Sequence, residues 1–365
     1  MNRAESGRPT CAPNGMRILL MASADSSNSN AQSLNAREIA LRLDPERFVL
    51  TFFYEHVPDP RLEKRANIRL VKLPARNRTW RILREMLGRP RLIAYMDYSP
   101  AAYAFLHLPA ILRRKTITVM HVEAPATQLG GTTRRLRFLH DGVAPRCTVH
   151  TAITDFVLRD LQSRGYSSEY ILPVGVDTRF FVPPAVRQNA VPVVLFTGTI
   201  IERKGAHLVV EAARQIPEAQ FRIVGSGRDG FEEKLRQEVR ESKIANVQFL
   251  GPQPQPKLVE TMQQSDVFLL PSRMEGIPKV TLEAAATGMP CVVFRDYETP
   301  SVIDGKTGFQ VGTFDEVVDR LRCLIQNPRL RSEMSVAAVL HARSFDWNVV
   351  AQRWEEAYLR MAGEM

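Results

Sequence analysis

The sequence has no uninterrupted apolar stretch near 18 residues, so it offers no segment that would cross a bilayer as a helix. Its first fifteen residues also lack the apolar core of a secretory signal peptide, and both absences lead us to expect a cytoplasmic protein. The four cysteines lie far apart and share no metal-ligand spacing with the seven histidines. We therefore expect reduced thiols, no disulfide and no structural zinc.

Other chemical signatures are missing as well. No Asp-x-Asp motif occurs in a metal-binding loop, so we expect neither a divalent metal nor a resident cofactor. Zinc-finger spacing, an RNA-binding signature and internal repeats are also absent. Nucleic acid is therefore not an expected partner, although the chain carries a net charge of +10.

The positive charge is concentrated in the first half of the chain. Residues 1–182 carry 27 Lys and Arg against 16 Asp and Glu, whereas residues 183–365 carry 22 against 23. One segment of the first half, Trp80 to Leu87, mixes basic and apolar residues as a helix bound to a membrane surface does. A solvated basic surface would have the same composition. We expect contact with an anionic membrane surface or an anionic acceptor.

The length of 365 residues favours two domains, and the order of the predicted elements agrees. After a loose tail at 1–15, helical stretches such as 31–43 alternate with apolar strands. We place these strands at 16–21, 48–53, 68–73, 92–95 and 116–120. Such alternation predicts a first domain, at 16–182, built on a parallel sheet covered on both faces.

A Pro-rich connection at 181–184 precedes a second series of alternating elements. Its strands are expected at 193–197, 221–224, 247–250, 267–270 and 291–294. They predict a second parallel-sheet domain at 183–344. The last segment, 345–365, has an apolar stripe at helical spacing and is expected to form a helix.

The most informative residues are two glutamates, Glu275 and Glu283, with seven residues between them. Glu275 follows a strand that ends near Pro271, and Glu283 lies within a helix expected at 280–287. The loop Gly276-Ile277-Pro278-Lys279 runs into the start of that helix, where unpaired N–H groups and the helix dipole favour an anion. Two carboxylates that accept hydroxyl groups, next to a phosphate site, predict a sugar-nucleotide site.

This strand, loop and helix resemble the E-x7-E signature of the retaining glycosyltransferases of family 4. That family has the GT-B fold, in which two Rossmann-like, doubly wound parallel-sheet domains face a central cleft. The resemblance covers most of the chain. It implies that Glu283 holds the nucleotide ribose, that Glu275 faces the donor sugar, and that the loop residues Gly276, Ile277, Pro278 and Lys279 meet the sugar and diphosphate. It also implies that residues 345–365 cross back to the first domain.

A second motif lies between a strand and a helix, in the segment Phe196 to Gly205. It resembles the family's Gly-Arg-Leu-x3-Lys-Gly segment, so Lys204 is expected to contact the donor diphosphate. A fixed cation there would stabilise the charge that builds on the leaving phosphate. By the same resemblance Gly198 and Thr199 line the donor site. Thr199 replaces the family's arginine, and Arg203 is the candidate to supply the missing guanidinium.

The segment that begins Gly225-Ser226-Gly227 satisfies the G-x-G-x-x-G fingerprint of NAD- and FAD-binding proteins. The fingerprint occurs late in the chain, however, and the next strand ends in Gly251-Pro252 instead of the acidic residue that binds an adenosine ribose. By the family resemblance, Gly225 and Gly227 allow close backbone approach beside the nucleotide, and Gln253 lies near the nucleobase.

Candidate residues in the first domain depend mainly on the resemblance. His121 follows a predicted strand, as does the family histidine that contacts the donor sugar, and Glu123 is a candidate acceptor contact. The loop after the first strand has Ser and Asn in place of the family's Gly-Gly pair; its Asn30 can cap the next helix and face the acceptor. Two further departures are Val174, where the family has Asn, and Ser301, where it usually has Glu.

The motifs and the resemblance together predict transfer of a sugar from a nucleotide-activated donor to a hydroxyl acceptor without a metal, and the resemblance implies retention at the anomeric carbon. By the resemblance, Lys204 and Arg203 stabilise the leaving phosphate, and that phosphate accepts the acceptor's proton. Glu275 and His121 orient the sugar. The family and the basic first half suggest polysaccharide, lipopolysaccharide or other glycoconjugate assembly. The acceptor would be lipid-linked or an anionic glycan, met in the cytoplasm or at the inner face of the membrane.

Three alternatives stay open. A sugar-nucleotide 2-epimerase of the same fold would release nucleotide without needing an acceptor. A non-catalytic sugar-nucleotide-binding protein would fit Thr199 and the glycine-free first loop. A nicotinamide oxidoreductase would use Gly225-Ser226-Gly227 to bind NAD. The nucleobase, the sugar and the acceptor are not determined by these motifs.

Overall fold

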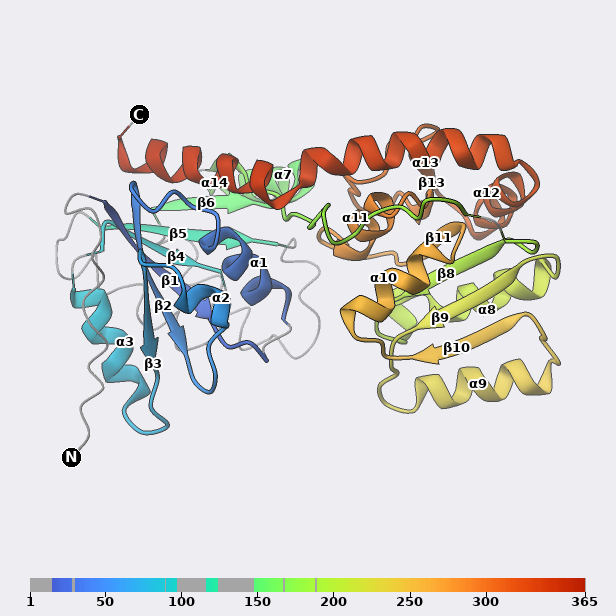
Figure 1. Ribbon diagram of the computed structural model, residues 1–365, viewed down its shortest axis with the longest axis horizontal. Helices are drawn as coiled ribbons and strands as arrows, with labels where there is room; N and C mark the ends of the chain where they lie inside the picture. Colours follow the sequence, from blue (N-terminus) through green and yellow to red (C-terminus); the bar gives the residue numbers. More distant parts are fainter. Residues whose placement is uncertain are drawn as a thin grey trace. The chain divides into compact units, whose positions relative to one another are not determined.

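The computed structural model describes residues 15–27, 30–88, 90–96, 116–123, 148–166, 168–187 and 189–364. The chain divides into two compact units: unit 1 runs to Pro173 and resumes at Trp347, and unit 2 runs from Val174 to Asp346. Each unit is a β-sheet packed with helices (Figure 1). The tail expected at 1–15 lies, apart from its last residue, outside the described residues.

Unit 1 is built on a seven-stranded sheet in the order β3-β2-β1-β4-β5-β6-β7, and every neighbouring pair is parallel. Its strands are β1 (Met16–Ser23), β2 (Phe48–Tyr54), β3 (Ile68–Lys72), β4 (Leu92–Tyr95), β5 (Ile117–Val122), β6 (Val149–Ala152) and β7 (Ser168–Ile171). The order reverses between β1 and β4, which is the doubly wound pattern. All four residues of β4 are buried, as expected for a central strand with both faces covered.

The described helices of unit 1 are α1 (Ala31–Ala40), α2 (Pro60–Glu63), α3 (Arg78–Leu87), α7 (Asp155–Ser163) and α14 (Trp347–Ala362). α14 follows unit 2 in the sequence, yet it belongs to unit 1 and packs against α1 (Figure 1). Its Val350, Trp354 and Tyr358 are buried, and Trp354 Nε1 donates to the carbonyl oxygen of Pro173 at 3.3 Å. The apolar stripe of the terminal segment is therefore the packing face of this helix.

Unit 2 is built on a six-stranded parallel sheet in the order β10-β9-β8-β11-β12-β13, which reverses between β8 and β11. Its strands are β8 (Val193–Thr197), β9 (Gln220–Val224), β10 (Val247–Gly251), β11 (Val267–Leu270), β12 (Cys291–Phe294) and β13 (Gly308–Val311). Its helices are α8 (Ala206–Gln215), α9 (Phe231–Glu241), α10 (Gln255–Gln263), α11 (Lys279–Ala286), α12 (Phe314–Gln326) and α13 (Pro328–Ala342), with 3₁₀ turns η4 (Glu202–Lys204) and η5 (Arg343–Phe345).

The prediction of two Rossmann-like, doubly wound parallel-sheet domains is confirmed. The structural division falls at 173/174, nine residues before the boundary that the sequence suggested. The segment after Pro173 bonds to the end of unit 2: Val176 N donates to the Phe345 carbonyl at 2.9 Å, and Thr178 Oγ1 donates to Asp346 at 2.5 Å. No described helix has the length and apolar character needed to span a membrane.

Some elements differ from the expectation. β5 does not end at Met120 but continues to Val122, so His121 lies inside the strand. α1 ends at Ala40, three residues earlier than expected. The four-residue strands β6, β7 and β13 were not anticipated, because they contain polar residues or glycine and lack the long apolar runs of the central strands.

Candidate functional site

The candidate donor site lies at the carboxyl edge of the sheet of unit 2. β8, β9 and β11 are parallel, so the loops that follow Thr197, Val224 and Leu270 leave the sheet at the same edge. In open α/β sheets, ligands bind outside this edge, where the strand order reverses. The three sequence motifs, at 198–205, 225–230 and 271–279, are these loops.

Lys204 and Glu275 form an ion pair here, with 2.5 Å between Lys204 Nζ and Glu275 Oε1. Arg203 Nη1 lies 3.6 Å from the same oxygen and donates a hydrogen bond to the Met274 carbonyl at 2.5 Å. The side chains of Glu275 and Lys204 are 11% and 18% exposed, whereas that of Arg203 is 48% exposed. The structure thus brings together the two cations and the carboxylate that the sequence proposed for the leaving group and the sugar.

Two residues fix this arrangement. Gly205 has a φ of +74°, and a Cβ there would lie 2.1 Å from the Pro271 carbonyl oxygen, so glycine alone lets the Lys204 turn pack against the end of β11. Ser272 is fully buried, and its Oγ lies 2.9 Å from Glu275 Oε1 and 3.2 Å from the Arg203 carbonyl. Sequence reasoning missed Ser272; a serine directly after the strand-ending proline was the available signal.

The glycines of the other two motifs have a structural cause. A Cβ on Gly225 would lie 1.9 Å from the Gly198 carbonyl oxygen, and one on Gly227 would lie 2.3 Å from Glu232 Cβ. Gly227 N also donates to Glu232 Oε2 at 2.6 Å. These glycines therefore let segments of the protein approach each other closely. Their presence needs neither a dinucleotide nor a sugar nucleotide to explain it.

Glu283 occupies the middle of α11 and is 8% exposed. Burial raises the pKa of its carboxyl from 4.5 to about 7, and the nearby charge of Lys279 lowers that pKa by a smaller amount. Among the described residues, no hydrogen bond or ion pair satisfies this carboxyl. A buried carboxyl group held without a hydrogen-bond donor is costly to the fold, and it can accept hydroxyl groups of a ligand.

The loop before α11 presents main-chain donors to the same edge. Gly276 and Ile277 are half-buried, and no hydrogen bond within the described residues uses their amide N–H groups. Pro278 is the N-cap of α11, and its carbonyl accepts from Thr281 N at 2.9 Å. Lys279 is the first helical residue. The arrangement supplies free N–H groups at a helix N-terminus, which suits an anion.

Three further residues of unit 2 are already engaged. Gln253 Oε1 accepts from Thr261 Oγ1 at 2.8 Å, and the Thr199 carbonyl accepts from Ile201 N at 3.0 Å. Ser301, at the place of the family's glutamate, has its Oγ 2.6 Å from Thr281 Oγ1. Ser301 therefore ties the loop after β12 to the first turn of α11.

The candidate residues of unit 1 interact with other side chains and main-chain groups of the same unit. His121 is 1% exposed; its Nδ1 lies 2.7 Å from Thr151 Oγ1, and its ring packs on Trp354 with 4.7 Å between centroids. Burial lowers the pKa of His121 from 6.5 to about 3, so the imidazole is neutral at neutral pH. Asn30 caps α1 by accepting from Ser33 N at 2.9 Å, and Glu123 accepts from Asn35 Nδ2 at 3.1 Å.

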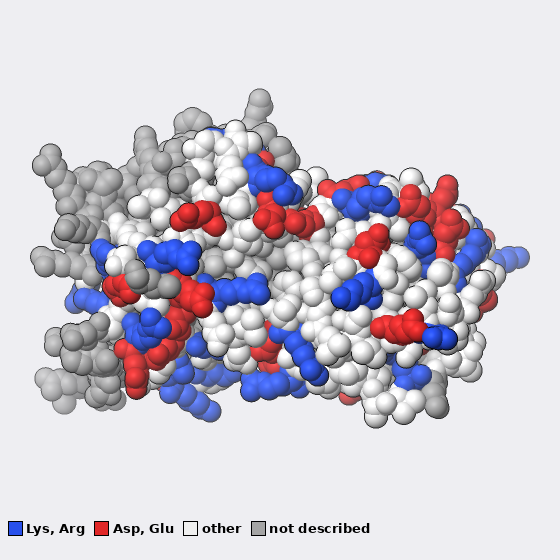
Figure 2. All heavy atoms as spheres, turned by 90° about the horizontal axis from the view of Figure 1, so that it is seen from above, with Lys and Arg blue, Asp and Glu red and all other residues white. Residues whose placement is uncertain are grey.

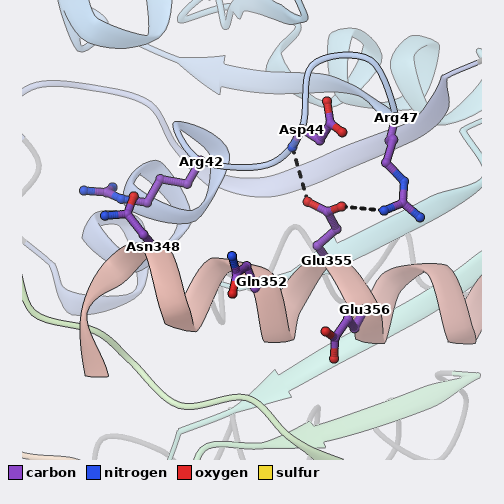
Figure 3. A pocket seen from close by; sticks show the side chains of 7 residues that line it. All are labelled: Arg42, Asp44, Arg47, Asn348, Gln352, Glu355 and Glu356. Carbon is purple, nitrogen blue, oxygen red and sulfur yellow. Dashed lines mark hydrogen bonds and ion pairs between the residues drawn. The ribbon is translucent and has the colours of Figure 1, made fainter. Parts of the chain in front are cut away.

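A separate hollow of about 390 Å³ lies in unit 1, between α14 and the loop that joins α1 to β2 (Figure 3). It is lined by Arg42, Asp44, Arg47, Asn348, Gln352, Glu355 and Glu356. Glu355 ties its two walls together, since its carboxylate pairs with Arg47 at 2.8 Å and accepts from Asp44 N at 3.4 Å. None of the predicted site residues lines this hollow. Elsewhere too, the described residues include no cluster of His, Cys, Asp or Glu that could hold a metal ion.

Residues 180–340 match the family model described as "Glycosyl transferases group 1". The chain is 33% identical over 178 residues to a D-inositol 3-phosphate glycosyltransferase of Corynebacterium diphtheriae, a match that covers 46% of this chain and 42% of that protein. It is 29% identical to a GDP-mannose-dependent phosphatidylinositol monomannoside mannosyltransferase of Corynebacterium glutamicum, over 56% of this chain and 60% of that protein. The chain thus spans about half the length of the curated relatives it matches.

Solved structures match over nearly the whole chain. Anabaena HepE in complex with UDP aligns with a TM-score of 0.77 and 18% identity, covering 94% of this chain and all of that one. Sucrose-phosphate synthase of Thermosynechococcus elongatus aligns with a TM-score of 0.78 and 14% identity, over 96% of this chain and all of that one. At these identities the likeness establishes the fold, and the GT-B prediction is confirmed.

Proposed function

We propose that the protein is a glycosyltransferase that moves a sugar from a nucleoside diphosphate sugar to a hydroxyl acceptor. The observation that carries the proposal is the Lys204–Glu275 ion pair at the carboxyl edge of unit 2, followed in α11 by the buried carboxyl of Glu283, which has no hydrogen-bond donor among the described residues. The match of residues 180–340 to the group 1 glycosyltransferase family supports it, because that match contains all three residues. The relatives named for UDP or GDP-mannose support a nucleotide-sugar donor.

The roles follow from charge and position. Lys204 and Arg203 stabilise the negative charge that develops on the leaving diphosphate, and the N–H groups of Gly276 and Ile277 bind its oxygens. Glu283 accepts the ribose hydroxyls, and this contact relieves the cost of burying its carboxyl. Glu275 turns from Lys204 toward the hydroxyls of the sugar. Gly198, Thr199, Gly225, Gly227 and Gln253 line the nucleotide, with Pro278 and Lys279 beside the diphosphate.

We propose that the reaction follows the mechanism of the retaining glycosyltransferases of family 4. The acceptor oxygen bonds to the anomeric carbon on the face that the leaving phosphate departs from, and that phosphate takes the acceptor's proton. Neither a covalent sugar–enzyme intermediate nor a metal ion is needed, since the lysine and arginine carry the charge stabilisation. His121, which is neutral, takes part as a hydrogen-bonding group and not as a cation. On unit 1, Asn30 and Glu123 belong to the acceptor side.

The acceptor is part of the proposal as well. We assign the protein to glycoconjugate assembly, with a lipid-linked or anionic glycan acceptor met from the cytoplasm at the inner face of a membrane. The excess of basic residues in 1–182 supports this assignment, because anionic surfaces attract such charge. The curated relatives include proteins named for inositol phosphate and phosphatidylinositol mannoside acceptors.

The first test is thermal unfolding with UDP, GDP, ADP and their sugar conjugates. A nucleotide at a hundred times its Kd stabilises the folded protein by about 2.7 kcal/mol. We expect one nucleotide to stabilise the wild type and Glu333→Ala, a matched glutamate change on α13, but not Glu283→Ala. Absence of any stabilisation, or equal stabilisation of Glu283→Ala, contradicts the assignment of the site.

Turnover of the responding sugar nucleotide then separates the remaining activities. Nucleotide release that depends on a hydroxyl acceptor supports transfer. Release without acceptor, together with an epimerised sugar, indicates a 2-epimerase of the same fold. Binding without release indicates a protein that holds sugar nucleotides without catalysis. Stabilisation by NAD alone contradicts the transferase, the epimerase and the non-catalytic binding protein alike.

A further inference from the structure

The strongest unassigned surface in the described part of the chain lies on α3 of unit 1. Trp80 is 69% exposed, the highest value among the exposed large hydrophobic residues that the structure describes, and Leu87 is 40% exposed. Arg84 lies between them and is also exposed. Positions i, i+4 and i+7 of a helix share one face, so these three side chains form a single stripe, which we call the α3 face.

The opposite side of α3 holds the helix against unit 1. Ile82 and Met86 are buried, and the buried carboxylate of Glu85 forms an ion pair with Arg69 of β3 at 2.7 Å. Arg78, the first helical residue, pairs with Glu55 at 2.6 Å. The helix therefore has its own buried side, and the α3 face is a second apolar surface that folding leaves in water.

The chain segment that contains the α3 face is basic. Residues 69–91 contain eight Lys and Arg but one acidic residue, Glu85, which is buried and paired. Lys72 and Arg76, just before the helix, are exposed like Arg84, and none of the three forms an ion pair with a described residue. On the face of the molecule seen in Figure 2, by contrast, acidic and basic side chains lie side by side.

We propose that the α3 face binds the surface of an anionic lipid bilayer, with Trp80 and Leu87 at the headgroup level and Arg84 on the lipid phosphates. This inference rests on the membrane contact proposed above and names the element that makes it. Tryptophan favours the interface between lipid and water, and exposed arginines favour anionic headgroups. Two apolar side chains, Trp80 and Leu87, with the cation Arg84 between them therefore suit the interface between lipid and water.

Two other occupants fit the α3 face less well. A second copy packed on it symmetrically would bring Arg84 of each chain toward the other, and juxtaposed like charges cost free energy. An anionic glycan would pair with the arginines but would leave the exposed Leu87 in water. Both occupants give results in the test that differ from those of a bilayer.

The chain contains its own probe of this contact. Of its three tryptophans, Trp347 and Trp354 are 2% and 1% exposed, so Trp80 alone responds to a change of surroundings at the surface. We expect the tryptophan emission of the full chain to shift to the blue, and iodide quenching to fall, on addition of phosphatidylglycerol vesicles. Phosphatidylcholine vesicles should cause neither change, and added salt should reverse both.

Variants of the α3 face and of the neighbouring Arg76 locate the binding site in a vesicle sedimentation assay. Arg84→Gln and Arg76→Gln should each weaken binding to anionic vesicles about fivefold, since each arginine near such a surface contributes about that factor. Trp80→Ala should weaken it as well. The matched controls lie on α13 of unit 2: Arg329→Gln removes an exposed arginine, and Leu340→Ala removes an apolar side chain that is 57% exposed. Neither control should change binding.

The results that would contradict the membrane proposal can be told apart from one another. Vesicle binding that is unchanged in the α3 variants places the membrane contact elsewhere, and no binding to either lipid removes it. An emission shift that depends on protein concentration without vesicles assigns the α3 face to a second copy. Stabilisation by nucleotides is measured on the same variants. Because Trp80 and Arg84 lie in unit 1, a lack of stabilisation by nucleotides would contradict the glycosyltransferase proposal and not the membrane proposal.

Discussion

The polar residues at the carboxyl edges of the two sheets differ in their interaction partners. In unit 2, Lys204 and Glu275 pair with each other at the edge, and buried Glu283 has no hydrogen-bond donor among the described residues, so ligand groups can replace the first contact and supply the second. In unit 1, the described candidates are engaged by the fold itself: Asn30 caps α1, and His121 packs on Trp354. The proposed donor site in unit 2 therefore has polar groups ready for a ligand, whereas the described candidates of unit 1 mainly maintain the structure of that unit.

The largest expected effect tests the prepared site. Lys204→Met should lower sugar transfer by roughly 10²–10³-fold, because it removes a fixed cation from the developing negative charge. Arg203→Met should cost less, since Arg203 is 48% exposed and its charge is better screened by water. Steady-state turnover with the responding donor measures both variants. If both changes lower turnover equally, the closer pairing of Lys204 with Glu275 does not identify Lys204 as the main catalytic cation.

Glu283 provides the second test, through pH. Its pKa rises from 4.5 to about 7 on folding, so the folded state binds this proton more tightly and unit 2 loses stability as the pH rises from 4.5 through 7. The loss attributable to this group is about 3 kcal/mol. Glu283→Gln should abolish that part of the pH dependence, as measured by hydrogen exchange of β11 and β12 peptides. A Gln variant with the wild-type profile would show that the carboxyl is not the titrating group.

His121 should give the opposite dependence in unit 1. Its pKa falls from 6.5 to about 3 on folding, so the unfolded state binds the proton more tightly and stability is lost as the pH falls below 6.5. His121→Phe keeps an aromatic ring beside Trp354 and should remove this acid sensitivity. It should cost about 1 kcal/mol at pH 7, because the hydrogen bond to Thr151 is lost. Exchange of β5 and β6 peptides between pH 4 and 7 follows both effects.

The smallest expected effect concerns Asn30. Asn30→Ala removes the cap of α1 and should lower stability by about 1 kcal/mol, without changing the stabilisation that the nucleotide confers on unit 2. Denaturant unfolding with and without nucleotide measures both quantities. If the stability of the variant is unchanged, the hydrogen bond from Ser33 N does not stabilise α1, and the contrast between the two edges is smaller than we infer.

Sequence patterns predicted the fold correctly, whereas the roles that they assigned to single residues stay predictions. The central strands β1, β8, β11 and β12 are apolar runs, which only a sheet covered on both faces buries, so their places could be predicted. The short strands β6 and β7 carry polar residues and depend on neighbouring strands for their pairing, so no local pattern marked them. The glycines at 225 and 227 matched a cofactor fingerprint, yet contacts inside the protein account for them.

By itself, the sequence determined the two alternating series of strands and helices, the spacing of Glu275 and Glu283, and the basic character of the first half. These are properties of local order and composition, which the chain carries before it folds. The tertiary structure alone decided that Lys204 meets Glu275, that Glu283 is buried, that His121 lies inside a strand and that Trp80 faces water. Contacts between residues distant in the sequence, and the burial that shifts a pKa, arise only when the strands pair and the helices cover them.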